Sequence, residues 1–488
     1  MNVATLFAWL LPLLVGAAVY LAASPERLPG WRSAAGGYGI VIGLLLVSAC
    51  TAIVARSDTA HAWLRAAPLL AIVGIGAALV FRRRSRSLAA ARDSDGNARA
   101  EMPRWKRTLL GVLFASLGLR AVVALREIWL RPLYPWDAWS AWAVKAKAWF
   151  LLGHHVRFVS LHDWLVQSGK EYYTSIAWMY PVTLAWVDIW FASAAGGWVE
   201  PLVNLPWLAL WIAVLLAHYG QWRALGVSRD RALFFVYVLG SLPLLLVHAA
   251  LAGYADLWIA AVFGLALLAW VRWLQSRDRG QLVLAIALAC VLPCLKVEGW
   301  IWASCLLATI VFGALSARWR WLVLAAAAIF VGVLLGGGLR WLLEHVGWLD
   351  AAGGIVDARA GSFVLLLQPQ WHGAAARDIA SALFALPNWH FLWWLVPVAL
   401  ACRWREIGAR TWLWLPAFLL LQCFAALAFL FLATDAAQWA KSFTAINRLI
   451  LQLTPAVVTL VALALRDAQL PATASGTAPV SVARIDRA

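Results

Sequence analysis

The segment RWKRTLLGVLFASLGLRAVVALREIWLRPLYPWDAWSAW, residues 104–142, decides the fold. It opens with a basic cluster at 104–107, continues as an apolar run over 109–130, and ends in the sequence WDAW at 136–139. An apolar run of about 20 residues is long enough to cross a bilayer as a helix. Because positive flanks mark the cytoplasmic end of such a helix, the run is predicted to deliver Asp137 to the external side.

Similar apolar runs recur along the whole chain, which has 488 residues, 64% of them hydrophobic and 13% charged. This composition predicts an all-α polytopic membrane protein with about 13 transmembrane helices. The first large external loop is predicted to contain an interfacial helix at 136–150, where tryptophans recur at helical spacing beside two lysines. The predicted spans are 4–22, 38–55, 66–82, 108–130, 201–219, 232–251, 256–274, 281–297, 299–316, 320–340, 388–402, 411–432 and 447–465.

The formal net charge of +17 is distributed in a way that indicates membrane orientation. Basic residues cluster at 82–107 and then recur between apolar runs, at every second loop. This is the positive-inside pattern, in which basic loops stay in the cytoplasm. The charge therefore does not indicate a nucleic-acid partner, and membrane lipids are the predicted surroundings. The later basic groups lie at 223–231, 272–279, 318–320 and 403–410.

Composition divides the chain into four predicted regions. Residues 176–195 are apolar, but counting them as a span would place every later basic loop outside, so we predict a re-entrant or juxtamembrane segment. A long external loop is predicted at 341–385. The four regions are three additional N-terminal transmembrane helices (1–82), a basic cytoplasmic linker (83–107), a membrane core (108–466) and a disordered tail (467–488).

Ionisable residues gather at the external ends of spans that are far apart in the sequence. Asp137 follows the fourth span, Asp256 ends the motif GYAD at 253–256, and Arg448 opens the last span. Lys296 and Glu298 belong to the hairpin motif KVEG. Such residues cost about 2.5–3.5 kcal/mol each inside a membrane, so a shared depth indicates a site.

The chemistry of these residue types suits the transfer of a sugar from a phospholipid donor. A carboxylate can accept the proton of an acceptor hydroxyl. Lysine and arginine can hold the departing phosphate. Tryptophans offer flat faces for a sugar or a prenyl chain.

The WDAW segment with Lys145 and Lys147, the motifs GYAD and KVEG, and the late Asn447-Arg448 pair together resemble the C-type integral-membrane glycosyltransferases. Within this family, the chain most resembles the bacterial branch that is similar to protein O-mannosyltransferases and the lipid A aminoarabinose transferase. The resemblance covers about residues 108–466. The resemblance implies inverting transfer from a polyprenyl-phosphate-linked sugar to a glycan, lipid or protein acceptor. It also implies a bacterial inner (plasma) membrane protein with an external, periplasmic active site.

The resemblance also assigns roles to residues. Asp137 is the expected catalytic base, Lys296 and Arg448 the expected phosphate ligands, and Asp256 with Glu298 the expected orienting groups. Lys145 and Lys147 are expected substrate-binding residues. No cofactor is expected, and a divalent metal is not supported, because Asp137 has no acidic neighbour until Asp163.

Simpler roles remain open for each of these residues. Asp137 and Asp256 can cap helices. Lys145 and Lys147 can extend to lipid headgroups. Lys296 and Glu298 can form a local ion pair, and Arg448 can anchor the interface. For the whole protein, a transporter or flippase for a lipid or small solute is the alternative function, and a non-catalytic envelope scaffold is a third.

Overall fold

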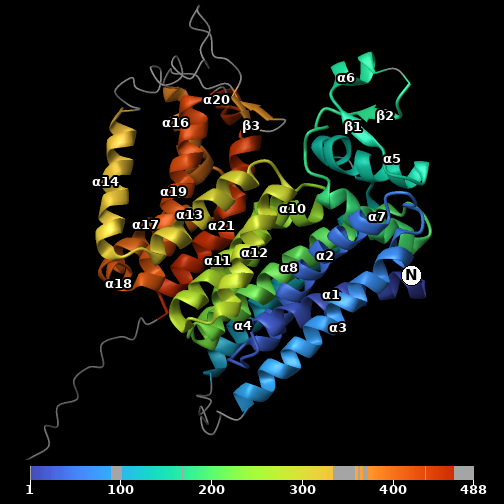
Figure 1. Ribbon diagram of the computed structural model, residues 1–488. Coiled ribbons are helices and arrows are strands. Elements are labelled where there is room, and N and C mark those ends of the chain that lie inside the picture. Colours follow the sequence, from blue (N-terminus) through green and yellow to red (C-terminus); the bar gives the residue numbers. More distant parts are fainter. Residues whose placement is uncertain are drawn as a thin grey trace, which may run out of the picture.

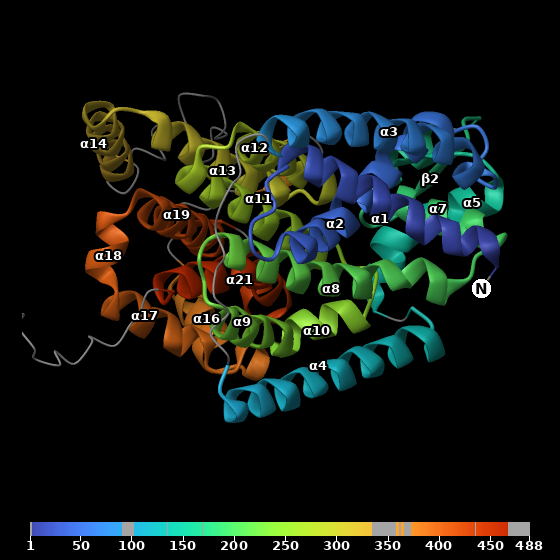
Figure 2. The same cartoon turned by 90° about the horizontal axis from the view of Figure 1, so that it is seen from below.

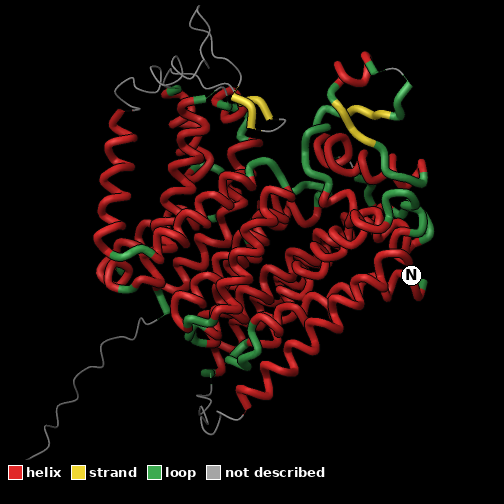
Figure 3. The backbone as a smooth tube through the Cα atoms, in the orientation of Figure 1, coloured by secondary structure: helices red, strands yellow, loops and turns green. Residues whose placement is uncertain are grey.

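The computed structural model is almost entirely helical over the residues it describes (Figures 1 and 3). Two pairs of three-residue strands are the exception: β1 (Arg157–Val159) pairs in parallel with β2 (Tyr172–Thr174), and β3 (Ala358–Ala360) pairs antiparallel with β4 (Phe363–Leu365). The described residues are 2–89, 102–133, 135–167, 169–333, 358–360, 363–365, 372–434 and 436–466. Much of the predicted external loop and all of the predicted tail lie outside these ranges.

Within the described ranges, eight helices are long and apolar enough to cross a membrane. This confirms an all-α polytopic membrane protein. The eight are α1 (Val3–Ala23), α2 (Trp31–Val54), α3 (Ala62–Ala89), α4 (Arg104–Leu130), α8 (Glu200–Ala224), α11 (Asp256–Ser276), α19 (Thr411–Ala433) and α21 (Thr444–Ala464).

The predicted number of 13 spans is not confirmed, because several predicted spans are broken or short. The predicted span 232–251 consists of α9 (Arg229–Ser241) and α10 (Pro243–Ala250), which are bent by 61° where Pro243 interrupts the helix. Counted as one span, this pair would be the ninth. The shorter helices are α7 (Thr183–Ala195), α12 (Arg279–Leu295), α13 (Gly299–Ala314), α14 (Ala317–Val333), α16 (Gly373–Phe384) and α17 (Leu392–Cys402).

The remaining elements lie between these helices. The predicted helix at 136–150 is present as a π-helix, η1 (Ala138–Ala143), continued by α5 (Val144–Leu152). At 13 residues, α7 is too short to cross a bilayer, and it ends at Gly196 in the left-handed conformation. The other short helices are α6 (Leu161–Val166), η3 (Pro387–Trp389), α18 (Trp404–Ala409) and α20 (Ala437–Ala440).

Two helices, α11 and α21, form the centre of the bundle, since 94% of the apolar window of each is buried. They pack against each other, and α11 also packs against α12 and α8. The corresponding share is only 11% for α3 and 17% for α4. Figure 2 shows α4 at the outer edge beside α9 and α10, so most of its apolar surface is available to lipid.

The three N-terminal helices pack tightly through glycines. A Cβ at Gly16 of α1 would lie 2.0 Å from the carbonyl oxygen of Gly39 of α2, which real contacts exclude. A Cβ at Gly37 of α2 would lie 2.5 Å from the carbonyl oxygen of Ala213 of α8. Small residues allow helix backbones to approach closely, and this close packing stabilises helix association in a bilayer, where the hydrophobic effect does not. Residues 1–82 therefore pack directly against the predicted core.

Basic residues from different loops meet at one end of the bundle. Arg84 lies 3.5 Å from Asp278, which joins α3 to the start of α12. The Arg466 guanidinium donates to the Leu225 carbonyl at 2.6 Å, which joins the ends of α21 and α8. We call this the basic end. The opposite end, at the top of Figure 1, carries α5, α6, β1 and β2.

Candidate functional site

A pocket of about 480 Å³ opens at the end opposite the basic end. Four segments that are distant in sequence form its walls: η1, the loop before α7, the α12–α13 hairpin, and the region from the end of α19 to the start of α21. We call it the first pocket. Of the predicted site residues, the structure brings Asp137, Lys296, Glu298 and Arg448 to its lining.

Asp137 and Arg448 form an ion pair across the first pocket. The Arg448 guanidinium donates to Asp137 Oδ2 at 2.5 Å, joining residues 311 positions apart. The Asp137 side chain makes no capping hydrogen bond to η1. The Arg448 guanidinium also lies 5.4 Å from the ring centroid of Tyr254, in cation–π range. Asp137 therefore does not act as a helix cap. Arg448 has partners within the protein, so its role is not only to anchor the chain at the membrane interface.

Lys296 is buried between two carboxylates. Its ammonium lies 2.9 Å from Asp256 Oδ1 and 2.9 Å from Glu298 Oε1. The side chains of Lys296 and Asp256 are 7% and 1% exposed, so this is an interior ion pair. Removing one partner of such a pair typically costs about 3–5 kcal/mol, because the other charge is left buried. Lys296, Asp256 and Glu298 thus depend on one another for their positions.

Gln452 completes this network, and sequence reasoning missed it. Its amide donates to Asp256 Oδ1 at 2.6 Å and accepts from the Trp302 indole at 2.5 Å. Gln452 stands one helical turn after Arg448 on α21 and is fully buried. A polar residue one turn from an intramembrane arginine is a signal that would have identified it.

Tyr180 and Trp142 form an aromatic wall of the first pocket and were also missed. Their rings stack at 4.9 Å between centroids, with 2° between their planes. Burial, together with the nearby Glu298 carboxylate, raises the pKa of the Tyr180 phenol. Tyr180 therefore keeps its proton at neutral pH and can act as a hydrogen-bond donor. No local pattern at 176–182 marks this role, which depends on the loop folding against η1.

Lys145 supports the first pocket from behind. Its ammonium donates to the carbonyl oxygens of Ala177 at 2.8 Å, Trp178 at 3.3 Å and Tyr180 at 2.8 Å. The side chain is 1% exposed, so it does not extend to lipid headgroups. Burial lowers the pKa of Lys145 to about 8, while the three carbonyls favour the charged form. Lys145 therefore holds the 177–180 loop in place behind the wall of the first pocket. Its side chain is not part of the pocket lining.

Lys147, two residues further on, faces a different pocket. Its ammonium lies 3.5 Å from Glu200 Oε1 and 5.9 Å from the ring centroid of Trp198. The side chain is about half exposed. The sequence analysis predicted the same substrate-binding role for both lysines, whereas the structure gives them different environments.

The hairpin at 251–255 positions the start of η1. Gly253 has φ +100°, and a Cβ there would lie 2.7 Å from the Cβ of Ala138. The Trp207 indole donates to the Tyr254 carbonyl at 2.7 Å, which ties the same hairpin to α8. Only glycine fits both this backbone conformation and this contact. The GYAD motif thus places Asp256 in the network and supports the helix that carries Asp137.

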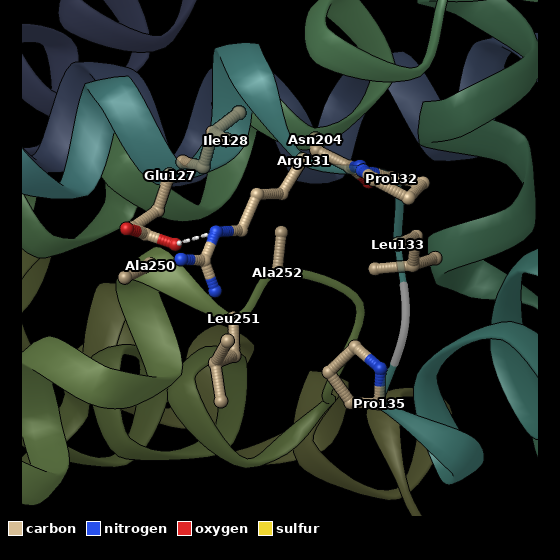
Figure 4. A pocket seen from close by; sticks show the side chains of 10 residues that line it. All are labelled: Glu127, Ile128, Arg131, Pro132, Leu133, Pro135, Asn204, Ala250, Leu251 and Ala252. Atoms are coloured by element: carbon tan, nitrogen blue, oxygen red, sulfur yellow. Dashed lines mark ion pairs between the residues drawn. The ribbon is translucent and has the colours of Figure 1, made fainter.

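A much smaller cavity, of about 20 Å³, lies between α4 and the 250–252 loop (Figure 4). Figure 4 shows the Arg131 side chain paired with Glu127, at 3.0 Å. Such a cavity has room for about one water molecule. It is too small to hold a substrate.

His154, in the loop after α5, has local partners. His154 lies 2.8 Å from Glu171 Oε2, and its ring also contacts the Leu152 carbonyl at 3.0 Å. Among the described residues, no group of three His, Cys, Asp or Glu side chains is arranged to hold a metal ion.

Comparison with protein-family models, with curated proteins and with solved structures found no match.

Proposed function

We propose that this protein is an inverting glycosyltransferase that moves a sugar from a polyprenyl-phosphate donor to an envelope acceptor. The observation that carries the proposal is the meeting of Asp137, Arg448 and Lys296 in one pocket at one end of a membrane bundle. A base and two phosphate-binding cations are the groups that this transfer requires.

The lining of the first pocket suits a lipid-linked substrate. Much of it is apolar, with Ile301, Phe431 and Leu449 beside the charged residues. Its volume lies in the range of about 300–1,000 Å³ that is typical of small-molecule sites. The apolar walls can hold the first prenyl units of a donor while the cations hold its phosphate.

The proposed step is a single displacement at the anomeric carbon. The acceptor oxygen forms a bond to this carbon, the bond from the carbon to the phosphate oxygen breaks, and the configuration inverts. Asp137 accepts the proton of the acceptor hydroxyl. The polyprenyl phosphate leaves with the electron pair of the broken bond, and Arg448 and Lys296 stabilise its charge.

Donor binding also releases the base in this proposal. In the described structure, Arg448 is bound to Asp137 at 2.5 Å, which holds the carboxylate away from an acceptor. A donor phosphate competes for the same guanidinium, because both are anions that arginine binds through charge-assisted hydrogen bonds. Asp137 is then free only when the donor is in place.

The test is mass spectrometry of envelope lipids and glycans from a bacterial deletion strain that carries the native gene or Asp137→Asn. A glycan lost, or a polyprenyl-phosphate sugar accumulated, in both the deletion and a stably expressed Asp137→Asn strain supports transfer. The control is Asp163→Asn, in the same loop, which accepts a local bond from Ser160. A normal glycan profile with Asp137→Asn would instead favour a transporter or scaffold.

The proposal places the first pocket on the external side of a bacterial inner membrane. In a cysteine-free variant, a cysteine introduced at Lys170 is expected to react in whole cells with a membrane-impermeant maleimide. A cysteine introduced at Arg405, at the basic end, is expected to react only after the cells are opened. The reverse pattern would contradict an external site.

A further inference from the structure

A second pocket, of about 400 Å³, lies against different residues of the η1–α5 segment. The first pocket is lined by Trp142 of this segment and by Asp137, the residue just before it, whereas the second is lined by Trp139, Val144 and Lys147. No residue lines both pockets. The size of the second pocket is again that of a small-molecule site.

The charges in the second pocket compensate each other. Lys147 lies 3.5 Å from Glu200, and the second carboxylate oxygen of Glu200 accepts from the Leu133 amide at 3.2 Å. An anionic headgroup that approached Lys147 would also meet the Glu200 carboxylate. This pair suits an uncharged ligand with hydroxyl groups, which can donate to the carboxylate and accept from the ammonium.

One polar group at the second pocket has no partner among the described residues. The Trp198 indole N–H is buried and unpaired. Buried polar groups are nearly always satisfied, so this N–H is expected to bond to water or to a ligand. Asn204, which is 6% exposed, adds an amide to the same lining.

Tryptophan side chains supply apolar surface beside these polar groups. Trp139 is 43% exposed and lines the pocket together with Trp198. The C–H face of a sugar ring is apolar, whereas its edge carries hydroxyls, so aromatic faces beside an amide and a carboxylate match both parts.

We infer that the second pocket binds an uncharged saccharide, the sugar end of the acceptor. The acceptor role rests on the proposed glycosyl transfer, whereas saccharide binding itself does not. The two pockets flank one short segment, which carries Asp137 beside the first and Lys147 beside the second. This arrangement gives donor and acceptor separate sites on the same segment.

The test is binding of full-length protein in nanodiscs to an array of uncharged hexose and pentose oligosaccharides, printed beside sialylated and sulfated ones. We expect binding to uncharged glycans that falls about tenfold in Glu200→Gln, which keeps the acceptor for the Leu133 amide but removes the charge. Trp198→Phe is a second variant that removes the unpaired N–H and keeps an aromatic ring. Lys441→Gln, an exposed lysine on neither lining, is the matched control.

Each outcome decides the inference. Binding of uncharged glycans that both Glu200→Gln and Trp198→Phe weaken supports it. Binding of anionic glycans alone, displacement by phosphatidylglycerol vesicles, or no variant-dependent binding to the array overturns it. Asp137→Asn should bind the same glycans as the native protein. If Asp137→Asn also leaves the envelope glycans unchanged, glycosyl transfer fails while the saccharide site stands.

Discussion

The two ends of the bundle use their cations differently. At the basic end, arginines donate to main-chain carbonyls where helices finish: Arg84 to Ala22, Arg320 to Gly313 and Arg466 to Leu225, each at 2.6 Å. Such contacts complement the helix dipole and satisfy unpaired carbonyls. At the other end, Lys296 and Arg448 pair with acidic side chains around a pocket.

This difference separates charges that orient a membrane protein from charges that form a site. The contact of an arginine with the carbonyls at a helix end is worth about 0.3–1 kcal/mol. Lys296 is 7% exposed and shares two carboxylates, so its loss leaves other charges buried and unpaired. Substitutions at the two ends should therefore differ both in size and in additivity.

The largest expected effect is that of Lys296→Met. Losing the cation between Asp256 and Glu298 should lower the free energy of unfolding by about 3–5 kcal/mol, measured by thermal unfolding of the purified protein. Adding Asp256→Asn should recover part of the loss, because one buried charge is then removed. Arg320→Gln, at the basic end, is the control and should cost no more than about 1 kcal/mol. Equal losses at the two ends would contradict the distinction.

Arg448→Gln tests the same contrast through activity. Arg448 lies near the start of α21, and Arg466 lies just after its end. Loss of one charge-assisted contact to a donor phosphate is worth about 1.5–3 kcal/mol, or about 10- to 100-fold in product formed. Arg466→Gln should leave product formation within about twofold of native. Mass spectrometry of envelope glycans measures both, and equal falls for the two variants would argue against a phosphate ligand at Arg448.

Gly253→Ala is expected to have a smaller effect, confined to the site end. The new Cβ would meet Ala138 at 2.7 Å on a backbone with φ +100°, at a cost of about 1–3 kcal/mol. Displacing the start of η1 should also reduce activity. Gly118→Ala on α4, where nothing lies within 4 Å, is the control and should keep or slightly raise the unfolding temperature. A Gly253→Ala protein with native stability and activity would show that the hairpin does not position Asp137.

Sequence patterns predicted the parts of this structure that depend on composition. Apolar runs located α1 to α4 because lipid requires internally bonded helices. The pattern of basic loops predicted that the groups at 82–107 and 272–279 lie at the same end of the bundle. The Arg84–Asp278 contact joins these two groups. The broken span at Pro243 was missed, although a proline inside an apolar run is a recognised cause of a bend.

The sequence predicted the level of the site residues in the membrane but did not predict which side chains pair. The positions of Asp137 and Arg448 at span ends placed both at one level, but their contact joins residues 311 positions apart. Lys145 and Lys147 looked equivalent because both follow the same tryptophans. Only the approach of the 177–180 loop, whose carbonyls surround Lys145, distinguishes them. Every residue has a main-chain carbonyl, so residue types alone do not predict contacts of this kind.

The smallest expected effect is the pH dependence that Lys145 contributes. Burial lowers its pKa to about 8 from an ordinary value of 10.5. Between these values the unfolded chain holds a proton that the folded protein has released, so this group makes the free energy of unfolding rise with pH across that window. The carbonyls of the 177–180 loop favour the ammonium and oppose the shift, so the rise should be smaller than the about 3 kcal/mol that a full shift from 10.5 to about 8 would give.

Lys145→Gln removes the titrating group, so its free energy of unfolding should lack this rise. The measurement is chemical unfolding of both proteins near pH 8 and near pH 10.5. The native protein should gain stability relative to the variant as the pH increases, whereas Lys441→Gln should keep the native profile. A native protein that instead loses stability relative to Lys145→Gln over this window would show that the three carbonyls outweigh burial. Lys145 would then resemble the cations that pair with carboxylates at this end, and its charge would be part of what holds the first pocket together.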